Sequence, residues 1–215
     1  MRAVLLVSAL LVFAHPTWAT IEFVRVPTGG LQPQAALDAR GALHLIYFKG
    51  EPAAGDVFYI RRDPATAAFT PPLRVNSQPN TVIAIGTVRG AHLALGKDGR
   101  PHIAWMGAGD ATAGMHYARL DDAGQAFEPQ RNLSQVAHEL DGGGSIAADP
   151  LGHVYVAWHA GNDGEEKRRV WVARSQDEGH TFAAETPVSP EETGACGCCG
   201  MRAMADDMGR LYLLY

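Results

Sequence analysis

"RSQDEGHTF", residues 174–182, follows the apolar run VWVA and ends in a Thr-Phe pair. Ser, Asp and Gly favour turns, and apolar residues on both sides favour strands, so this stretch predicts a turn between two strands. A partial copy, LDDAGQAF, occurs at residues 120–127 and keeps Asp122, Gly124 and Phe127. The turn is therefore one copy of a repeat.

A second pattern recurs with the same period. It appears in AALDARGALHLIYF, LALGKDGRPHIAWM, IAADPLGHVYVAWH and AMADDMGRLYLLY. The repeat glycines lie 58, 53 and 57 residues apart, at Gly41, Gly99, Gly152 and Gly209. An aromatic residue follows each glycine by six positions, at Tyr47, Trp105, Trp158 and Tyr215. The residue five positions before the glycine is Ala36, Ala94, Ala147 or, in the last copy, Met204. Each copy predicts two strands joined by a tight turn.

Two further strands complete each unit. A third strand is predicted in FYIRR, HYARL and WVARS, and a weaker outer strand in PLRVNS, QRNLSQ and TPVSP, where proline is tolerated at a sheet edge. Four-stranded units that repeat on the order of every 55 residues are typical of a β-propeller. The sequence thus predicts an all-β propeller domain over residues 20–215, with blade repeats at about 31–80, 90–137, 143–192 and 202–215.

The complete turn carries Ser175, Asp177, Gly179, Thr181 and Phe182 in fixed order. This pattern, at this place in a four-stranded blade, resembles the Asp-box or BNR repeat of the sialidase-like propellers. The resemblance extends from about residue 21 to the end of the chain. It implies that the turn residues, together with their counterparts in the partial copy, brace the fold on the face away from the active site. The turn residues do not by themselves indicate an activity, because a fold alone specifies no chemistry.

The sialidase-like propellers usually have six blades, and six such repeats need roughly 330 residues. The 215 residues end midway through the fourth repeat. We therefore expect about three and a half blades of a longer propeller, a fragment whose exposed strand edges would allow self-association.

Residues 1–19 predict a secretory signal peptide. Arg2 gives a positive start, the run AVLLVSALLVFA is apolar but too short to span a bilayer, and small residues lead to a cleavage site at Ala19. We expect a secreted or periplasmic protein without a membrane span. The formal net charge of -5 and the lack of a long basic run argue against a nucleic-acid partner.

The resemblance implies three arginines for the substrate carboxylate, an aspartate as general acid and base, and a Tyr-Glu pair that would lie in blades outside this sequence. Asp56, in FKGEPAAGDVFYIRR, is the acid/base candidate. Arg89 and Arg202, near the starts of inner strands, are candidates for two carboxylate-binding arginines, since a guanidinium binds a carboxylate through two hydrogen bonds. His138 and His159, in loops expected at the same end of the axis, are two further candidates for substrate binding. A solvated turn residue at position 56 and arginines in ordinary salt bridges stay open as alternatives.

Three cysteines lie close together in GACGCCGM, at Cys196, Cys198 and Cys199. In an exported protein thiols usually form disulfides, and three cannot all pair with one another. The spacing fits no usual zinc pattern, so we predict a disulfide or thiol role and neither a metal nor a cofactor. Thiolates and thioethers do bind soft metals, and Met201, Met204 and Met208 follow, so a metal-binding loop is an alternative to methionines that fill the core.

Together these patterns favour an exported propeller that binds a glycan or another small anionic ligand at the axial end. One alternative is an exo-sialidase-type glycoside hydrolase with Asp56 as acid/base, and a second is a propeller that binds metal through the Cys/Met loop.

Overall fold

The structure is a computed structural model that describes residues 21, 23–26, 29–86, 89–161, 164–191, 194–196 and 200–215. The predicted signal peptide, residues 1–19, lies outside the described residues. Within the described part of the chain, no helix has the length and apolar composition needed to cross a membrane.

Strands make up nearly all of the regular structure. Blade 1 contains β1 (Leu31–Leu37), β2 (Leu43–Glu51), β3 (Ala54–Arg62) and β4 (Leu73–Arg74). Blade 2 contains β5 (His92–Leu95), β6 (Pro101–Met106), β7 (Met115–Arg119) and β8 (Arg131–Asn132), with the short 3-10 helices η1 (Lys97–Gly99) and η2 (Asp110–Thr112). Blade 3 contains β9 (Leu140–Ala148), β10 (Val154–Ala160), β11 (Arg169–Ser175) and β12 (Thr186–Pro187). The last hairpin contains β13 (Arg202–Ala205) and β14 (Leu211–Leu214).

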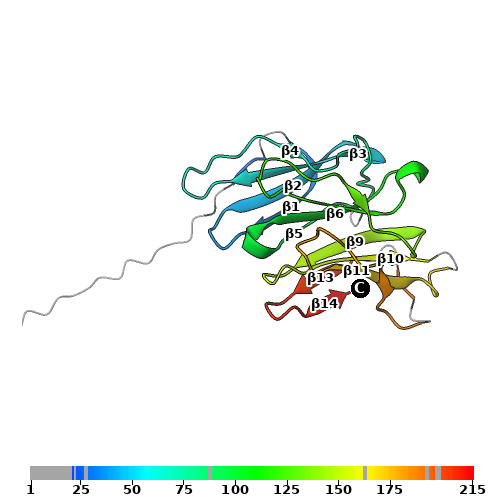
Figure 1. Cartoon of the computed structure of the whole chain (residues 1–215). Coiled ribbons are helices and arrows are strands. Elements are labelled where there is room, and N and C mark those ends of the chain that lie inside the picture. The colour runs from blue at the N-terminus through cyan, green and yellow to red at the C-terminus, as the bar shows by residue number, and fades with distance from the viewer. Residues whose placement is uncertain are drawn as a thin grey trace, which may run out of the picture.

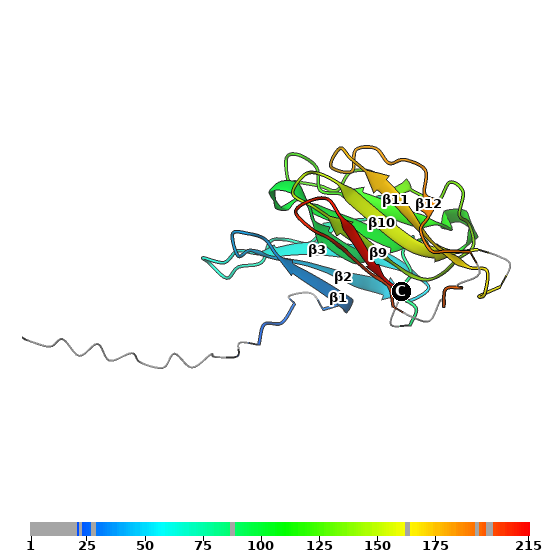
Figure 2. The ribbon, with the colours of Figure 1, turned by 90° about the horizontal axis from the view of Figure 1, so that it is seen from below.

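Each blade is an antiparallel sheet whose four strands lie side by side in chain order. The innermost strands contact one another in succession: β1 contacts β5, β5 contacts β9, and β9 contacts β13. Figure 1 shows the sheets following one another from blue to red, and Figure 2 shows the same sheets from below. This arrangement confirms the predicted all-β propeller of four-stranded blades, here three blades and a hairpin. The outer strands are only two residues long, as expected of weak edge strands.

An aspartate fixes the inner hairpin turn in blades 1 and 3 and in the last hairpin. Asp149 Oδ1 accepts hydrogen bonds from the backbone N–H groups two and four residues later, at 2.9 and 3.0 Å. Asp38 and Asp206 accept the same two bonds in their turns. The repeat glycine then takes a positive φ, +95° at Gly152, which costs glycine nothing. The Asp-x-x-Gly pattern therefore specifies the turn locally.

The aromatic residue of the second strand packs between blades. Trp105 and Trp158 are both 0% exposed. Trp105 belongs to one cluster with Ile46 and Tyr59 of blade 1, whereas Trp158 packs with Tyr117 of blade 2. This repeat position therefore packs neighbouring blades together at both junctions.

The turn after β11 is held together by its own Ser, Asp and Thr. The Ser175 hydroxyl donates to Asp177 Oδ1 at 2.7 Å and accepts from the backbone N–H of Gly179 at 2.8 Å. Thr181 donates to Asp177 through its backbone N–H at 2.9 Å and its hydroxyl at 2.6 Å. Burial raises the pKa of Asp177, but the hydrogen bonds from Thr181 and Ser175 outweigh it and lower the pKa to about 2.

This turn closes the junction between blades 2 and 3, which we call the closed junction. The Phe182 ring meets the Tyr117 ring edge-on, with 4.7 Å between centroids. Gly179 lies against the same tyrosine, since a Cβ at this glycine would come within 1.8 Å of the Tyr117 hydroxyl oxygen. The Arg131 guanidinium donates to the backbone carbonyls of Gly179 and His180. The turn is thus bound to blade 2 from several sides.

The partial copy after β7 is built differently from the sequence expectation. Leu120 and Ala126 stand where the complete turn has its two hydroxyl groups. Asp121 Oδ1 accepts the backbone N–H four residues later at 2.8 Å, the bond that Asp177 makes in the complete turn. Asp122 instead points outward with its side chain 74% exposed and accepts from Arg119 at 2.5 Å. We correct the assignment: Asp121, one residue earlier than expected, holds this turn.

The same turn faces the junction between blades 1 and 2, which we call the open junction. Phe127 packs edge-on against Tyr59 with 5.6 Å between centroids, as its counterpart does in the closed junction. Gly124 keeps the positive φ, +67°, but a Cβ there would meet no atom within 4 Å. The aromatic contact is therefore retained while the glycine has open space beside it.

Candidate functional site

The loops of the propeller lie at two ends of the blades. The turn face carries the inner hairpins and the turns after the third strands. The connector face carries the loops between second and third strands and the connectors between blades, because antiparallel strands alternate in direction. Asp56, Arg89, His138 and His159 lie in or beside these connector-face loops, and Arg202 begins β13 at the same end.

Polar side chains occupy one equivalent position on the four inner strands. Seven residues before each repeat glycine stand Gln34, His92, Ser145 and Arg202. All four line one cavity of about 250 Å³, and three of them line a second cavity of about 220 Å³. Alternate residues of a strand face the same side, so this position faces the propeller axis in every copy. We call these four residues the axial ring.

Two members of the axial ring link neighbouring inner strands. Gln34 Oε1 accepts the backbone N–H of Leu93 at 3.1 Å, and Ser145 Oγ accepts that of Ala203 at 2.9 Å. With its oxygen so used, the Gln34 amide nitrogen faces His92 Nδ1 at 3.0 Å and donates to it. The accepting Nδ1 places the proton of the neutral imidazole on Nε2.

The other two members offer donors to the cavity. His92 is 7% exposed, and its buried Nε2 has no hydrogen-bond partner among the described residues. Burial, with a smaller effect of the Arg202 charge, lowers the pKa of His92 to about 4, so the ring is neutral at pH 7. The Arg202 side chain donates to the neighbouring Met201 carbonyl at 2.7 Å and is otherwise exposed. An uncommitted N–H beside a guanidinium suits an anionic or oxygen-rich ligand.

A second cluster lies on the connector face around Asp141. Arg89 donates to Asp141 Oδ1 at 2.6 Å, and Arg168 approaches Oδ2 at 3.1 Å. The bond from Arg89 is the main reason that the pKa of Asp141 is lowered, and the Arg168 charge adds to it. Arg89, predicted to bind a substrate carboxylate, therefore binds a carboxylate of its own chain in this structure.

The two candidate histidines have different surroundings. His159 is 1% exposed, and neither ring nitrogen has a hydrogen-bond partner in the described structure. Burial lowers its pKa, the Arg168 charge lowers it further, and the Asp141 charge opposes both, so His159 adjoins the Asp141 cluster. His138 is exposed on the connector before β9. The structure thus brings one of the two histidines to the arginine cluster.

Asp56 lies on β3 and is half-buried. Its Oδ1 accepts from the Asn76 amide and from the backbone N–H of Asn80, both at 2.7 Å. Asn76 is 0% exposed and also accepts the Val57 N–H at 3.0 Å. Asp56 therefore anchors the connector that follows blade 1. If Asp56 were also catalytic, the same carboxylate would have both roles.

The Cys/Met loop is described only in part. Cys196 is half-buried, and Cys198 and Cys199 lie outside the described residues. Met201 is 1% exposed and packs in the core under β13, whereas Met204 and Met208 are 60% and 73% exposed. The residues that the structure describes contain no group of three or more His, Cys, Asp or Glu side chains placed to hold a metal ion.

Sequence motifs did not identify several of these residues. Gln34, His92 and Ser145 share their repeat position with Arg202, and aligning the copies on the repeat glycine would have found them. Asp141 and Arg168 stand in loops expected on the functional face, but 27 residues separate them. No local pattern indicates that they meet.

No protein-family model and no curated protein matches the sequence. Among solved structures, the chain is similar to a mutant of the NanB sialidase from Streptococcus pneumoniae, with a TM-score of 0.55 and 11% identity over 84% of this chain and 26% of that one. It is also similar to a protein of unknown function from Dyadobacter fermentans, with a TM-score of 0.52 and 12% identity over 83% of this chain and 50% of that one. The chain thus spans half of the second protein and less of the first. Such low identities show a shared fold alone.

Proposed function

We propose that the axial ring binds a small anionic ligand, with an acidic sugar as the preferred class. The observation that carries the proposal is the buried Nε2–H of His92, which has no acceptor within the described structure and lies in a cavity beside Arg202. A buried donor without a partner is costly, and a ligand oxygen would satisfy it. The Arg202 guanidinium would supply the charge and the geometry for a carboxylate.

The Asp141 cluster supports the same proposal from the connector face. Gly90, the residue after Arg89, lines the smaller axial cavity, so Arg89 and Arg202 belong to one end of the axis. The cluster contains two guanidinium groups, of Arg89 and Arg168, and two carboxylates, of Asp141 and of Glu165, which lies 3.6 Å from Arg168. Guanidinium donors at this end of the axis suit an anionic ligand.

We further propose that the turn 175–182 is an Asp-box of the sialidase-like propellers and that residues 1–19 direct export. The hydrogen bonds of Ser175, Asp177 and Thr181 support the first, because the residues that define the motif are those that hold the turn. The second rests on the charged, apolar and small-residue order of the N-terminal sequence. N-terminal sequencing of the exported protein tests it and should begin at Thr20.

A glycoside hydrolase is the alternative, with Asp56 as acid/base. The two hydrogen bonds that Asp56 Oδ1 accepts hold the connector after blade 1, so the geometry of this carboxylate is that of a structural anchor. We therefore rank binding above catalysis. Turnover of a fluorogenic sialoside that disappears in Asp56→Asn would reverse this order.

The proposed function is tested by titration calorimetry with N-acetylneuraminic acid. We expect saturable binding that weakens by about 10-fold or more in Arg202→Gln, because one charge-assisted interaction is lost, and that weakens also in His92→Phe. Arg210→Gln is the matched control, since Arg210 is exposed on the turn face and pairs with Asp206 at 2.6 Å. Equal affinity of the wild type and Arg202→Gln would refute the axial site.

A further inference from the structure

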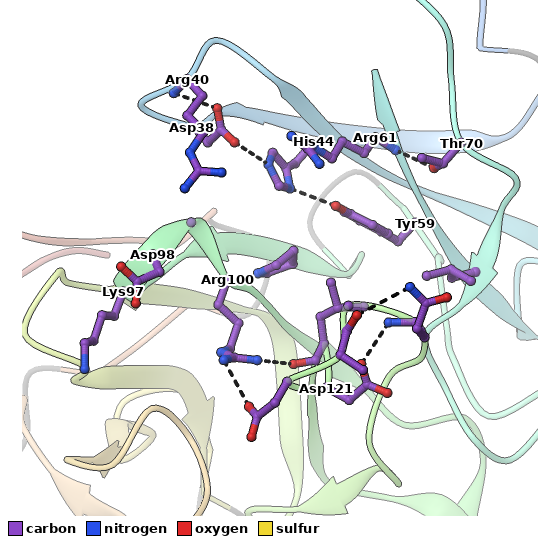
Figure 3. A pocket seen from close by; sticks show the side chains of 18 of the residues that line it. Asp38, Arg40, His44, Tyr59, Arg61, Thr70, Lys97, Asp98, Arg100 and Asp121 are labelled. Atoms are coloured by element: carbon purple, nitrogen blue, oxygen red, sulfur yellow. Dashed lines mark hydrogen bonds and ion pairs between the residues drawn. The ribbon is translucent and has the colours of Figure 1, made fainter. Parts of the chain in front are cut away.

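A cavity of about 550 Å³ lies on the turn face between blades 1 and 2. Figure 3 shows Asp38, Arg40, His44 and Tyr59 on its blade 1 side, opposite Asp98, Arg100 and Asp121 of blade 2. None of the axial-ring residues lines it. Its volume is in the range of small-molecule sites. This cavity is the space left in the open junction.

The cavity reaches Tyr59 and Leu73, whereas the cavity of about 540 Å³ on the turn face between blades 2 and 3 is not lined by the residues at the equivalent positions. In the sheet register Leu73 pairs with Tyr59 as Arg131 pairs with Tyr117, so Leu73 occupies the position of the arginine that binds the turn of the closed junction. Leucine has no donor for the turn carbonyls. The turn after β7 therefore stands away from blade 1.

Polar groups at the floor of the cavity are already paired. His44 Nε2 lies 3.3 Å from Asp38 Oδ2, and its Nδ1 lies 2.8 Å from the Tyr59 hydroxyl oxygen. The pair of histidine and tyrosine recurs in the closed junction between His102 and Tyr117 at 2.7 Å. The recurrence indicates a structural role, so these groups shape the floor without being the ligand's main partners.

On the blade 1 wall, two arginine side chains have guanidinium groups that can bind a ligand. The buried Nε of Arg61 has no hydrogen-bond partner among the described residues. Arg40 is exposed at the rim, and its only described hydrogen bond comes from its backbone N–H to Asp38. Two arginines on one wall favour an anionic group such as a carboxylate.

On the blade 2 wall, the basic groups are used and two carboxylates are available. Arg100 donates to the Leu120 carbonyl at 2.8 Å and pairs with Asp122 at 3.0 Å. Asp98 is exposed, held at φ +58° in its turn, and no hydrogen bond of its side chain is described. Asp121 accepts its turn bond through Oδ1, which leaves Oδ2 for a ligand.

Apolar surface lies between the two walls and comes from Pro71, Leu73, Pro101 and Leu120. A cavity lined by apolar side chains together with carboxylates and guanidinium groups matches a pyranose ring, which has an apolar face and hydroxyls around its edge. A ligand with one carboxylate and several hydroxyls would satisfy both walls.

We infer that the open junction is a second ligand site, which binds an acidic monosaccharide of the hexuronic acid class. Its carboxylate lies at Arg61 and Arg40, and its hydroxyls donate to Asp98 and Asp121. The site lies at the opposite end of the blades from the axial site, and the inference holds whether or not the axial ring binds a ligand.

The test is titration calorimetry with galacturonic acid, using full-length Arg202→Gln as the parent so that the axial site does not contribute. We expect one binding event for galacturonic acid and at least 10-fold weaker binding of galactose, which lacks the carboxylate. Arg61→Gln and Arg40→Gln should each weaken binding by about 10-fold. Leu73→Arg should abolish it, because the new side chain would occupy the part of the cavity beside Tyr59, as Arg131 occupies the space beside Tyr117 in the next junction.

Arg62→Gln is the matched control, because Arg62 neighbours Arg61 in the chain, donates to the Ala67 carbonyl at 3.2 Å and does not line the cavity. Thermal melting confirms that each variant is folded, and the exposed Arg40 serves if Arg61→Gln does not fold. Absence of galacturonic acid binding by the folded parent, or equal binding by Arg40→Gln and the parent, would overturn the inference. Neither result affects the test of the axial ring with N-acetylneuraminic acid.

Discussion

The closed and open junctions are built from the same repeat, and each has a cavity on the turn face, about 540 and 550 Å³. Tyr59 and Leu73 line the cavity of the open junction, whereas their counterparts Tyr117 and Arg131 do not line that of the closed junction. In both, an aromatic residue of the turn packs edge-on against a tyrosine of the preceding blade, Phe182 on Tyr117 and Phe127 on Tyr59. Only the closed junction adds Arg131, which donates to the turn carbonyls and stacks 5.2 Å from the Tyr117 centroid. The aromatic pair therefore positions the blades, and the arginine decides whether the turn is held over the tyrosine.

The third-strand arginines show the same difference. Arg119 is 0% exposed in the closed junction and donates to Glu128 at 2.8 Å and to the Glu178 carbonyl at 3.0 Å. Its counterpart Arg61 is half-buried, with Nε unpartnered among the described residues. Repeat symmetry thus fixes where an arginine stands, whereas the neighbouring blade fixes what it binds. A binding site can arise where one copy loses its partners.

The largest effect should come from a methyl group at the closed junction. In Gly179→Ala the new Cβ would lie 1.8 Å from the Tyr117 hydroxyl at a φ of +79°. Overpacking and backbone strain together should cost about 3 kcal/mol or more of unfolding free energy, measured by urea denaturation. Gly124→Ala, at φ +67° with no atom within 4 Å, should cost only about 1–2 kcal/mol from strain. Equal losses would show that the two junctions are packed alike.

An intermediate effect should follow from making the closed junction resemble the open one. Arg131→Leu removes the donors to Gly179 and His180, so we expect a loss of about 2 kcal/mol of unfolding free energy. In the crystal structure of the variant, the cavity between blades 2 and 3 should extend to Tyr117, which does not line it in the wild type. Arg210→Gln, at an exposed ion pair, should change stability by about 0.5 kcal/mol or less. A variant as stable as the wild type would contradict the role assigned to Arg131.

The smallest effect, counted per pH unit, is a difference in how the unfolding free energy depends on pH. Burial, followed by the charges of Arg119 and Arg100, lowers the pKa of His102 to about 3, whereas Asp38 opposes the effect of burial on the pKa of His44. The unfolded chain binds a proton below about pH 6.5 that folded His102 excludes, so its contribution is complete above pH 6.5 and falls towards pH 3.

The loss of unfolding free energy should reach at most about 1.4 kcal/mol per pH unit for this residue. Urea midpoints at pH 7, 6, 5 and 4 measure it. His102→Gln should flatten the decline more than His44→Gln does, since Gln does not titrate. The same slope in both variants would mean that the two buried histidines titrate alike.

Much of the fold could be predicted because its determinants are local. The Asp-x-x-Gly turns, the period of the repeat glycines and the buried Trp105 and Trp158 follow from residues close in sequence or from the repeat itself. The partial turn was harder, because Asp121 and Asp122 are adjacent and sequence position alone does not tell which one accepts the turn bond.

The candidate site also has features that could be predicted from the sequence and others that could not. Arg202 and its end of the axis were predicted, and the shared repeat position of Gln34, His92 and Ser145 was available in the sequence. Only the tertiary structure decided that Arg89 and Arg168 meet at Asp141, that His92 keeps a buried donor without a partner in the described structure, and that the first junction is open. Strand period and turn chemistry act over a few residues, whereas ion pairs and cavities depend on side chains that different blades bring together.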